Sequence, residues 1–110
     1  MNKEVTAKVY TLYTENGSWL GQVVLTIDGS FMSITDWGNY NYHWSSTGCD
    51  DFRQFILKLN TDYFGTKMFQ GVCDISYTNK TREKAILFSE KILPALQEVL
   101  KKEIESEKNK

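Results

Sequence analysis

This sequence contains very little proline, histidine or cysteine, and it carries no excess of charge of either sign. One proline and seven glycines in 110 residues are too few for a disordered chain. Thirteen basic and fourteen acidic residues give a formal net charge of -1, whereas nucleic-acid-binding domains usually show a basic balance or a basic stripe. The composition therefore predicts a globular domain, and it makes nucleic acid the less expected partner.

The scarcity of histidine and cysteine excludes most metal sites. His43 is the only histidine, Cys49 and Cys73 lie far apart, and no CxxC pair occurs. No GxGxxG or P-loop motif is present. A nucleophile, base and acid could be drawn from Cys49, His43 and Asp50, but nothing in the sequence defines their mutual geometry. We therefore expect no metal, no cofactor and no catalytic residues, and hence a protein that is not an enzyme.

A long apolar run and a secretory leader are also missing. The start of the sequence, Met1-Asn2-Lys3-Glu4, lacks the apolar region of a signal peptide, and no apolar stretch approaches the roughly 20 residues that cross a membrane. These features predict a cytoplasmic protein with reduced thiols and no membrane partner. The length fits a single domain over residues 1–110.

What the sequence does contain is a series of turn signals between strand-like segments. The turn signals are Asn16-Gly17, Asp28-Gly29 and Gly38-Asn39. The segments between them are rich in β-branched and aromatic residues, and they span residues 4–14, 19–27, 30–37 and 40–45. This order predicts a four-stranded antiparallel β-meander.

Two-residue turns would define the register of this sheet. A turn at Asn16-Gly17 pairs Tyr10 with Val23, and one at Asp28-Gly29 pairs Leu25 with Met32. The more continuously apolar face, which we assign to the core, then carries Tyr10, Leu12, Val23, Leu25, Ile27, Met32 and Ile34. The outer face carries Val9, Tyr13, Leu20, Val24, Phe31 and Trp37.

Helical periodicity dominates the second half of the chain. Helices are predicted over residues 50–59, with Thr47 as the N-cap, over 61–69, and from about Thr81 to the tail. Pro94 should kink the last helix or divide it in two. Residues 72–77 allow a short strand. The predicted fold class is α+β: the meander packed by two to three helices, with a long kinked C-terminal helix.

The most informative stretch is residues 36–48, in which Tyr40, Tyr42 and Trp44 alternate with Asn41 and His43. If Gly38-Asn39 is a two-residue turn, these aromatics join the outer face as a binding platform. If the loop has three residues, they line the core, and the polar side chains face outward. We favour the core arrangement, because the alternative buries a histidine and exposes two tyrosines and a tryptophan.

Three segments of this region resemble small uncharacterised proteins of phages and prophages. They read D-W-G-N-Y-N-Y-H-W-S-S-T-G, D-F-R-Q-F-I-L-K-L and D-Y-F-G-T-K-M, and the resemblance covers roughly residues 20–68. It implies an accessory protein of a mobile element that binds host machinery, as anti-CRISPR and other anti-defence inhibitors do. It names no target.

These observations lead to a functional prediction of a non-enzymatic protein-binding module. A host defence protein is the expected partner, and a second copy of the chain would be another way to cover an apolar outer face. The alternative is a nucleic-acid or nucleotide-binding module that stacks bases on aromatic side chains. The candidate partner-binding residues are Tyr13, Phe31, Trp37, Asn39, Asn41 and His43.

Overall fold

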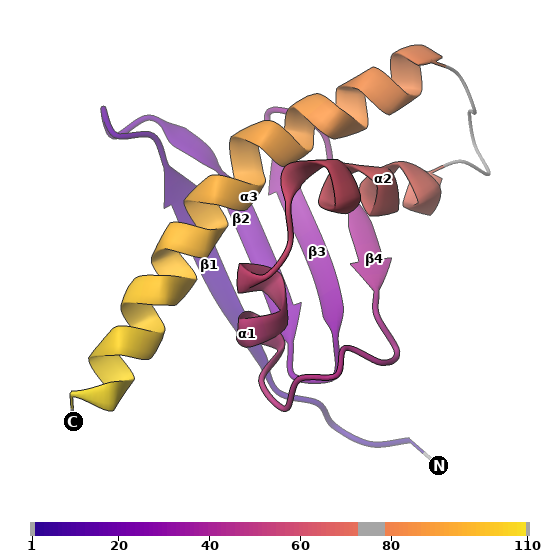
Figure 1. The fold of residues 1–110 in the computed structure, drawn as a ribbon. Coiled ribbons are helices and arrows are strands. Elements are labelled where there is room, and N and C mark those ends of the chain that lie inside the picture. Colours follow the sequence, from indigo (N-terminus) through magenta and orange to yellow (C-terminus); the bar gives the residue numbers. More distant parts are fainter. Residues whose placement is uncertain (1, 73–78, 110) are drawn as a thin grey trace.

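The computed structural model describes residues 2–72 and 79–109 (Figure 1). In these residues, four strands precede three helices. The strands are β1 (Ala7–Tyr13), β2 (Trp19–Thr26), β3 (Ser30–Thr35) and β4 (Asn41–His43). The helices are α1 (Phe52–Leu57), α2 (Thr61–Val72) and α3 (Asn79–Lys108). The strand predicted over residues 72–77 falls almost entirely outside the described residues, and its only described member, Val72, ends α2.

The strands form one antiparallel sheet in the order β1-β2-β3-β4. All three helices lie on the same side of this sheet, and α3 crosses it diagonally (Figure 1). The α+β class and the meander are therefore confirmed. One face of the sheet is covered by helices, and the other has no layer over it in the described residues.

The three hairpin turns share one sequence pattern, threonine followed three residues later by glycine. The segments are Thr14–Gly17, Thr26–Gly29 and Thr35–Gly38, and in each the glycine N–H donates to the threonine carbonyl. Each glycine has a positive φ, between 85° and 115°, which side chains other than glycine rarely adopt. In the first two turns the threonine hydroxyl also accepts the N–H of the residue after the glycine. These turns are one residue longer than the two-residue turns predicted from Asn-Gly and Asp-Gly.

The extra residue affects the first two hairpins differently. Tyr10 pairs with Val23 and Leu12 with Gly21, as predicted, because a register shift after Leu12 compensates for the longer turn. At this irregularity Leu20 turns to the helical side and is buried, so its predicted place on the outer face is wrong.

The register between β2 and β3 is shifted by one residue from the prediction. Leu25 pairs with Phe31 and Val23 with Ser33, because the turn Ile27-Asp28-Gly29 has no compensating bulge. A shift of one residue exchanges the two faces of a strand. Phe31 and Ser33 are therefore buried, whereas Met32, Ile34 and Ile27, which were predicted to be core residues, are exposed.

The aromatic stretch lines the core, as favoured. Tyr40 and Trp44 are each 7% exposed, while Asn41 and His43 are exposed. The Trp44 ring contacts Phe52, Phe55 and Phe64, and its Nε1 donates to the Tyr63 hydroxyl at 3.2 Å. The β3–β4 connection is longer than either loop that we considered, since residues 36–40 separate the two strands.

The helices begin and end close to the predicted positions. Asp51, rather than Thr47, is the N-cap of α1, and its carboxylate accepts the Arg53 N–H at 2.9 Å. Helix α3 continues through Pro94 as one element. Gly65 in α2 allows α3 to approach closely, because a β-carbon there would lie 3.2 Å from the Ile86 Cα. The fully buried side chains of α3 are Ala85, Phe88, Ser89, Ile92, Leu93, Leu96 and Leu100.

Candidate functional site

The side of the sheet without helices is left uncovered by the other described elements of the fold, and we call it the open face (Figure 1). Its residues follow from strand alternation and register, because directly paired residues share a face. β1 contributes Ala7, Val9, Thr11 and Tyr13, and β2 contributes Trp19, Gln22, Val24 and Thr26. β3 contributes Ser30, Met32 and Ile34, and β4 contributes Asn41 and His43.

Apolar side chains form a band across the middle of the open face. Val9, Val24 and Met32 lie in one cross-strand row, and Ile34 lies in the next row. Val9 is 58% and Ile34 is 61% exposed. None of the thirteen residues that define this face is Lys, Arg, Asp or Glu. The open face is therefore apolar at its centre and carries no formal charge when His43 is neutral.

Three of the predicted binding residues lie on this face. Tyr13 is at one corner beside Trp19, and Asn41 pairs with Met32. His43 pairs with Ser30, and its Nδ1 lies 2.8 Å from the Ser30 hydroxyl. The fold thus brings Tyr13, Asn41 and His43 onto one surface, although they come from the two outer strands of the sheet.

The other three predicted binding residues lie elsewhere. Phe31 is fully buried and packs edge-on against Phe64, so its predicted place on the outer face is wrong. Trp37 lies in the β3–β4 turn, where Lys91 of α3 sits 5.3 Å from its ring centroid, and it therefore faces the helical side. Asn39 is in the same turn and accepts the Thr35 N–H through its side chain.

Sequence reasoning missed Met32, Ile34 and Trp19 as residues of the outer face. The error in β3 follows directly from the assumed two-residue turn at Asp28-Gly29. The repeated Thr-x-x-Gly pattern was the signal available in the sequence, because it places the turn one residue earlier in the first two hairpins and two residues earlier in the third.

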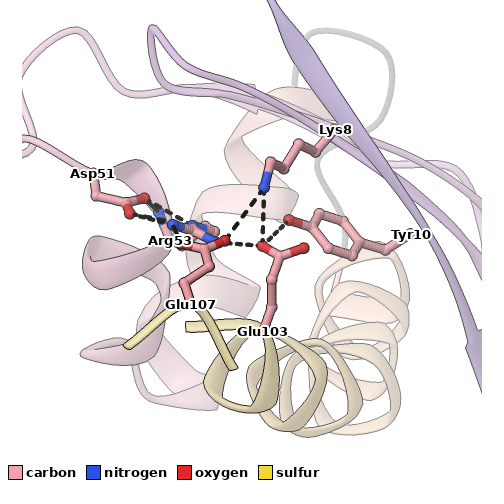
Figure 2. Close-up of polar contacts among 6 residues, drawn as sticks. All are labelled: Lys8, Tyr10, Asp51, Arg53, Glu103 and Glu107. Carbon is pink, nitrogen blue, oxygen red and sulfur yellow. Dashed lines mark hydrogen bonds and ion pairs between the residues drawn. The ribbon is translucent and has the colours of Figure 1, made fainter. Parts of the chain in front are cut away.

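A second candidate site is a cluster of charged groups on the helical side (Figure 2). Arg53 of α1 lies at its centre, with Asp51 on one side and Glu103 and Glu107 of α3 on the other. Arg53 Nη2 lies 2.7 Å from the Asp51 carboxylate, and Nη1 lies 2.8 Å from that of Glu107. Lys8 of β1 lies 3.4 Å from Glu103. The cluster joins the first strand, the first helix and the C-terminal helix.

The protonation behaviour of the cluster follows from these contacts. Burial acts to raise the pKa of Glu103, but hydrogen bonds from Arg53 and Tyr10 outweigh it and hold that pKa below its ordinary value. Hydrogen bonds from Arg53 likewise lower the pKa of Asp51 and Glu107. Burial and the hydrogen bond to Glu103 raise the pKa of Tyr10. The three carboxylates are therefore charged at neutral pH.

This cluster is built for structure rather than for ligand binding. A hollow of about 330 Å³ adjoins it between β1 and the start of α1. However, all three guanidinium nitrogens of Arg53 already donate to carboxylates, so Arg53 has none left for an anion. In residues 2–72 and 79–109, no group of three or more His, Cys, Asp or Glu side chains is placed to hold a metal ion. Nor is any helix in those ranges long and apolar enough to cross a membrane.

The fold and the open face define a small α+β domain that presents one face of its sheet without Lys, Arg, Asp or Glu side chains. The chain belongs to a phage family, Phage_phiTE_072, whose model matches residues 1–87. No curated protein and no solved structure matches it. The family match includes the whole sheet, α1 and α2, and it ends inside α3.

Proposed function

We propose that this phage protein is a non-enzymatic protein-binding module that inhibits a host defence system by covering a surface of one of its proteins. The observation that carries the proposal is the open face, with its apolar centre of Val9, Val24, Met32 and Ile34 and its lack of formal charge. Centres of protein–protein interfaces are likewise depleted in charged residues. A contiguous apolar patch on the surface of a protein often marks an interaction site.

The size of the face indicates what the partner must contact. Four strands about 4.8 Å apart and seven residues long give a projected area of roughly 400 Å². A stable interface covers about 800 Å² on each partner. The partner would therefore also reach the surrounding turns, which carry Asp28 and Asp36. Its own surface would be apolar in the centre, and the encounter would take place in the host cytoplasm.

The absence of cations on the open face favours a protein over a nucleic acid. Proteins that bind single strands combine stacking aromatics with a positively charged groove that follows the phosphates. Two of the alternating aromatics, Tyr40 and Trp44, are buried, and no residue of the open face is Lys or Arg. Stacking aromatics on the open face are therefore limited to Tyr13 and Trp19 at one corner, and the face lacks the positive charge that follows a phosphate backbone.

A non-enzymatic role is supported by the surroundings of the residues that could carry chemistry. The contacts of the two residues considered as base and nucleophile join them to different partners, His43 to the Ser30 hydroxyl and the Cys49 thiol to the Lys58 ammonium, rather than to each other. The carboxylates of Asp51 and Glu103 are occupied by Arg53. Occlusion of a partner surface needs none of these groups, only the shape and polarity of the face.

The proposal is tested by charging the open face and measuring protection of phage. Met32→Lys with Ile34→Lys should keep the melting temperature close to that of the wild type, because both side chains are exposed. We expect this variant to lose the ability to restore plating of a defence-sensitive phage on a defended host. A matched control charges α3 instead, by Leu87→Lys, whose side chain is 42% exposed. Full restoration by the open-face variant would contradict the proposal.

A photo-crosslinking amino acid identifies the partner and separates it from a second copy. Placed at Ile34, it should yield an adduct with a host protein during expression in the defended host, whereas at Leu87 it should not. An adduct of the chain with itself, together with a dimer in light scattering, would show instead that a second copy covers the face. Phe31 is unsuitable for this test, because it is buried and its substitution would unfold the domain.

A further inference from the structure

The two edges of the sheet differ in length and in cover. β4 has three residues, and α2 lies against it: a β-carbon added to Gly71 would come within 2.6 Å of the Asn41 carbonyl oxygen. β1 has seven residues, Ala7–Tyr13, and no described strand pairs with its outer side. Long uncovered edges are templates for pairing with another chain. The β1 edge is therefore the place where this sheet can be extended.

The register shows which backbone groups point away from the sheet. Ile27 N–H donates to the Thr6 carbonyl at 3.1 Å, so these two residues form a hydrogen-bonded pair. Hydrogen-bonded and non-hydrogen-bonded pairs alternate in antiparallel sheets. Ala7, Val9 and Thr11 consequently direct their N–H and C=O groups outward, past the edge. These are every second residue of β1, which is the spacing of the hydrogen-bonded pairs that one added antiparallel strand would form.

Helix α3 lies over the space beside this edge, on the helical side of the sheet (Figure 1). Its C-terminal half runs on past β1 on the helical side of the sheet (Figure 1). A hollow of about 260 Å³ lies between Thr11 and Tyr13 of β1 and Ala95 and Val99 of α3. Val99 is 36% exposed, whereas the following residue of α3, Leu100, is fully buried. A strand added at the edge would cover it.

We propose that the β1 edge, roofed by α3, receives an extended segment of a partner protein as a fifth strand. Backbone bonds to Ala7, Val9 and Thr11 would hold the segment. Its side chains would alternate between the hollow beside Val99 and the continuation of the open face next to Val9. Because Glu98 and Lys102 line this hollow together with Ala95 and Val99, small residues with apolar or hydroxyl side chains fit the first set of positions. This inference shares with the proposed function only the need for a protein partner.

A second copy of this chain is the less suitable occupant. If two β1 strands paired edge to edge, each copy would bring its own α3 to the same side of the junction. An extended segment without a helix of its own meets no such obstacle. The isolated segment is therefore the occupant that we commit to, and a dimer is an outcome that would overturn it.

The probe is a displayed library of random heptapeptides selected against the full chain. We expect selected peptides to alternate apolar and polar residues and, at saturation, to slow amide hydrogen exchange of Ala7, Val9 and Thr11 more than tenfold. Val9→Pro removes one outward N–H and leaves the bonds to β2 intact. It should weaken peptide binding at least tenfold, whereas the matched Val9→Thr should weaken it less than threefold.

The opposite results are equally defined. A library without binders, unchanged exchange at those three amides, or equal binding by Val9→Pro and Val9→Thr would overturn the proposal. If Val9→Pro fails to fold, N-methylation of each backbone position of a selected peptide replaces it, and binding must fall at alternate positions only. A wild-type dimer dissociated by Val9→Pro would assign the edge to a second copy.

The same variants separate this inference from the proposed function. Met32→Lys with Ile34→Lys should leave the outward amides of β1 free to bind a selected peptide. Peptide binding in that variant with loss of phage protection would support both surfaces independently. Val9 belongs to the open face as well as to the β1 edge, so Val9→Pro is read by peptide binding alone, and Met32→Lys with Ile34→Lys is the variant that separates the two surfaces.

Discussion

The two faces of the sheet are built from the same strands, and both carry large apolar side chains, yet only one of them is a core. On the helical side, Val23 and Phe31 are fully buried beneath α2 and α3. On the open face, Val9 and Ile34 are more than half exposed. The difference lies in what covers each face rather than in the apolar character of its residues.

This comparison shows that hydrophobicity alone does not tell a core from an interface. Charge does not distinguish the core face from the open face either, because neither face carries a charged side chain at its centre. What separates them is the helical layer, whose apolar stripe on α3 meets one face and leaves the other bare (Figure 1). An open face of this composition is stable in water only as long as its apolar area remains modest.

The largest expected effect comes from removing part of the helical layer. Truncation after Leu93 deletes Leu96, Leu100 and Ile104, which are buried, and each contributes about 1.5–3 kcal/mol. Their sum approaches the whole stability of a typical domain, about 5–15 kcal/mol. We expect the truncated protein to be unfolded or aggregated by circular dichroism and light scattering. Truncation after Lys108 is the control, and a soluble protein with an unchanged melting temperature after Leu93 would contradict the docking of α3.

A matched pair of substitutions compares the two faces directly. Trp44→Ala should lower the free energy of unfolding by about 3–5 kcal/mol, because the ring is buried among Phe52, Phe55 and Phe64. Ile34→Ala on the open face should change it by less than about 1 kcal/mol. Urea denaturation measures both values. Equal losses would mean that the open face is covered in solution.

The charged cluster should produce a smaller effect that depends on pH. Arg53→Met should cost about 1–2 kcal/mol at pH 7, since the cluster is only partly shielded from water. The pKa values of Asp51 and Glu103 are lowered in the folded protein, so their contribution is complete above their ordinary values near 4. It is lost as pH falls through the lowered pKa values.

The measurement is the melting temperature of the wild type and of Arg53→Met between pH 7 and pH 2.5. The gap between the two proteins should stay constant down to about pH 5 and close below about pH 4. A gap that persists unchanged at pH 2.5 would show that the ion pairs of Arg53 with Asp51 and Glu103 do not stabilise the fold.

Local sequence signals were sufficient for most elements of this fold. The Gly residues of the turns, the β-branched segments and the helical stripe of α3 placed the strands and helices within a few residues. The alternation of Tyr40, Tyr42 and Trp44 with polar residues left both faces open, and the cost of burying His43 while exposing these aromatics correctly favoured the core for Tyr40 and Trp44. These signals act over a few neighbours, and a reader of the sequence can weigh them without knowing the rest of the chain.

Only half of the candidate partner-binding residues could be placed correctly from the sequence in the same way. Asn41 and His43 are exposed, as favoured, because the alternative arrangement would have buried a histidine and exposed two tyrosines and a tryptophan. Phe31 was assigned to the outer face although it is buried, and Met32 and Ile34 were assigned to the core although they are exposed. The cause is one additional residue in the turn before β3, because a shift of one residue exchanges the two faces of a strand. The length of the first turn was also predicted one residue too short, but the bulge near Leu20 compensates for the additional residue, so the predicted pairs of β1 and β2 were still correct.

The sequence by itself determined the strand order, the positions of the turns and the helical segments of this protein, since these depend on contacts between near neighbours. The tertiary structure alone decided which face of the sheet the helices cover and that a bulge near Leu20 compensates for the longer first turn. It also decided that Arg53 meets Glu103, fifty positions along the chain. Such choices depend on the packing of all layers at once, because register and burial are settled together and no short window of sequence contains both.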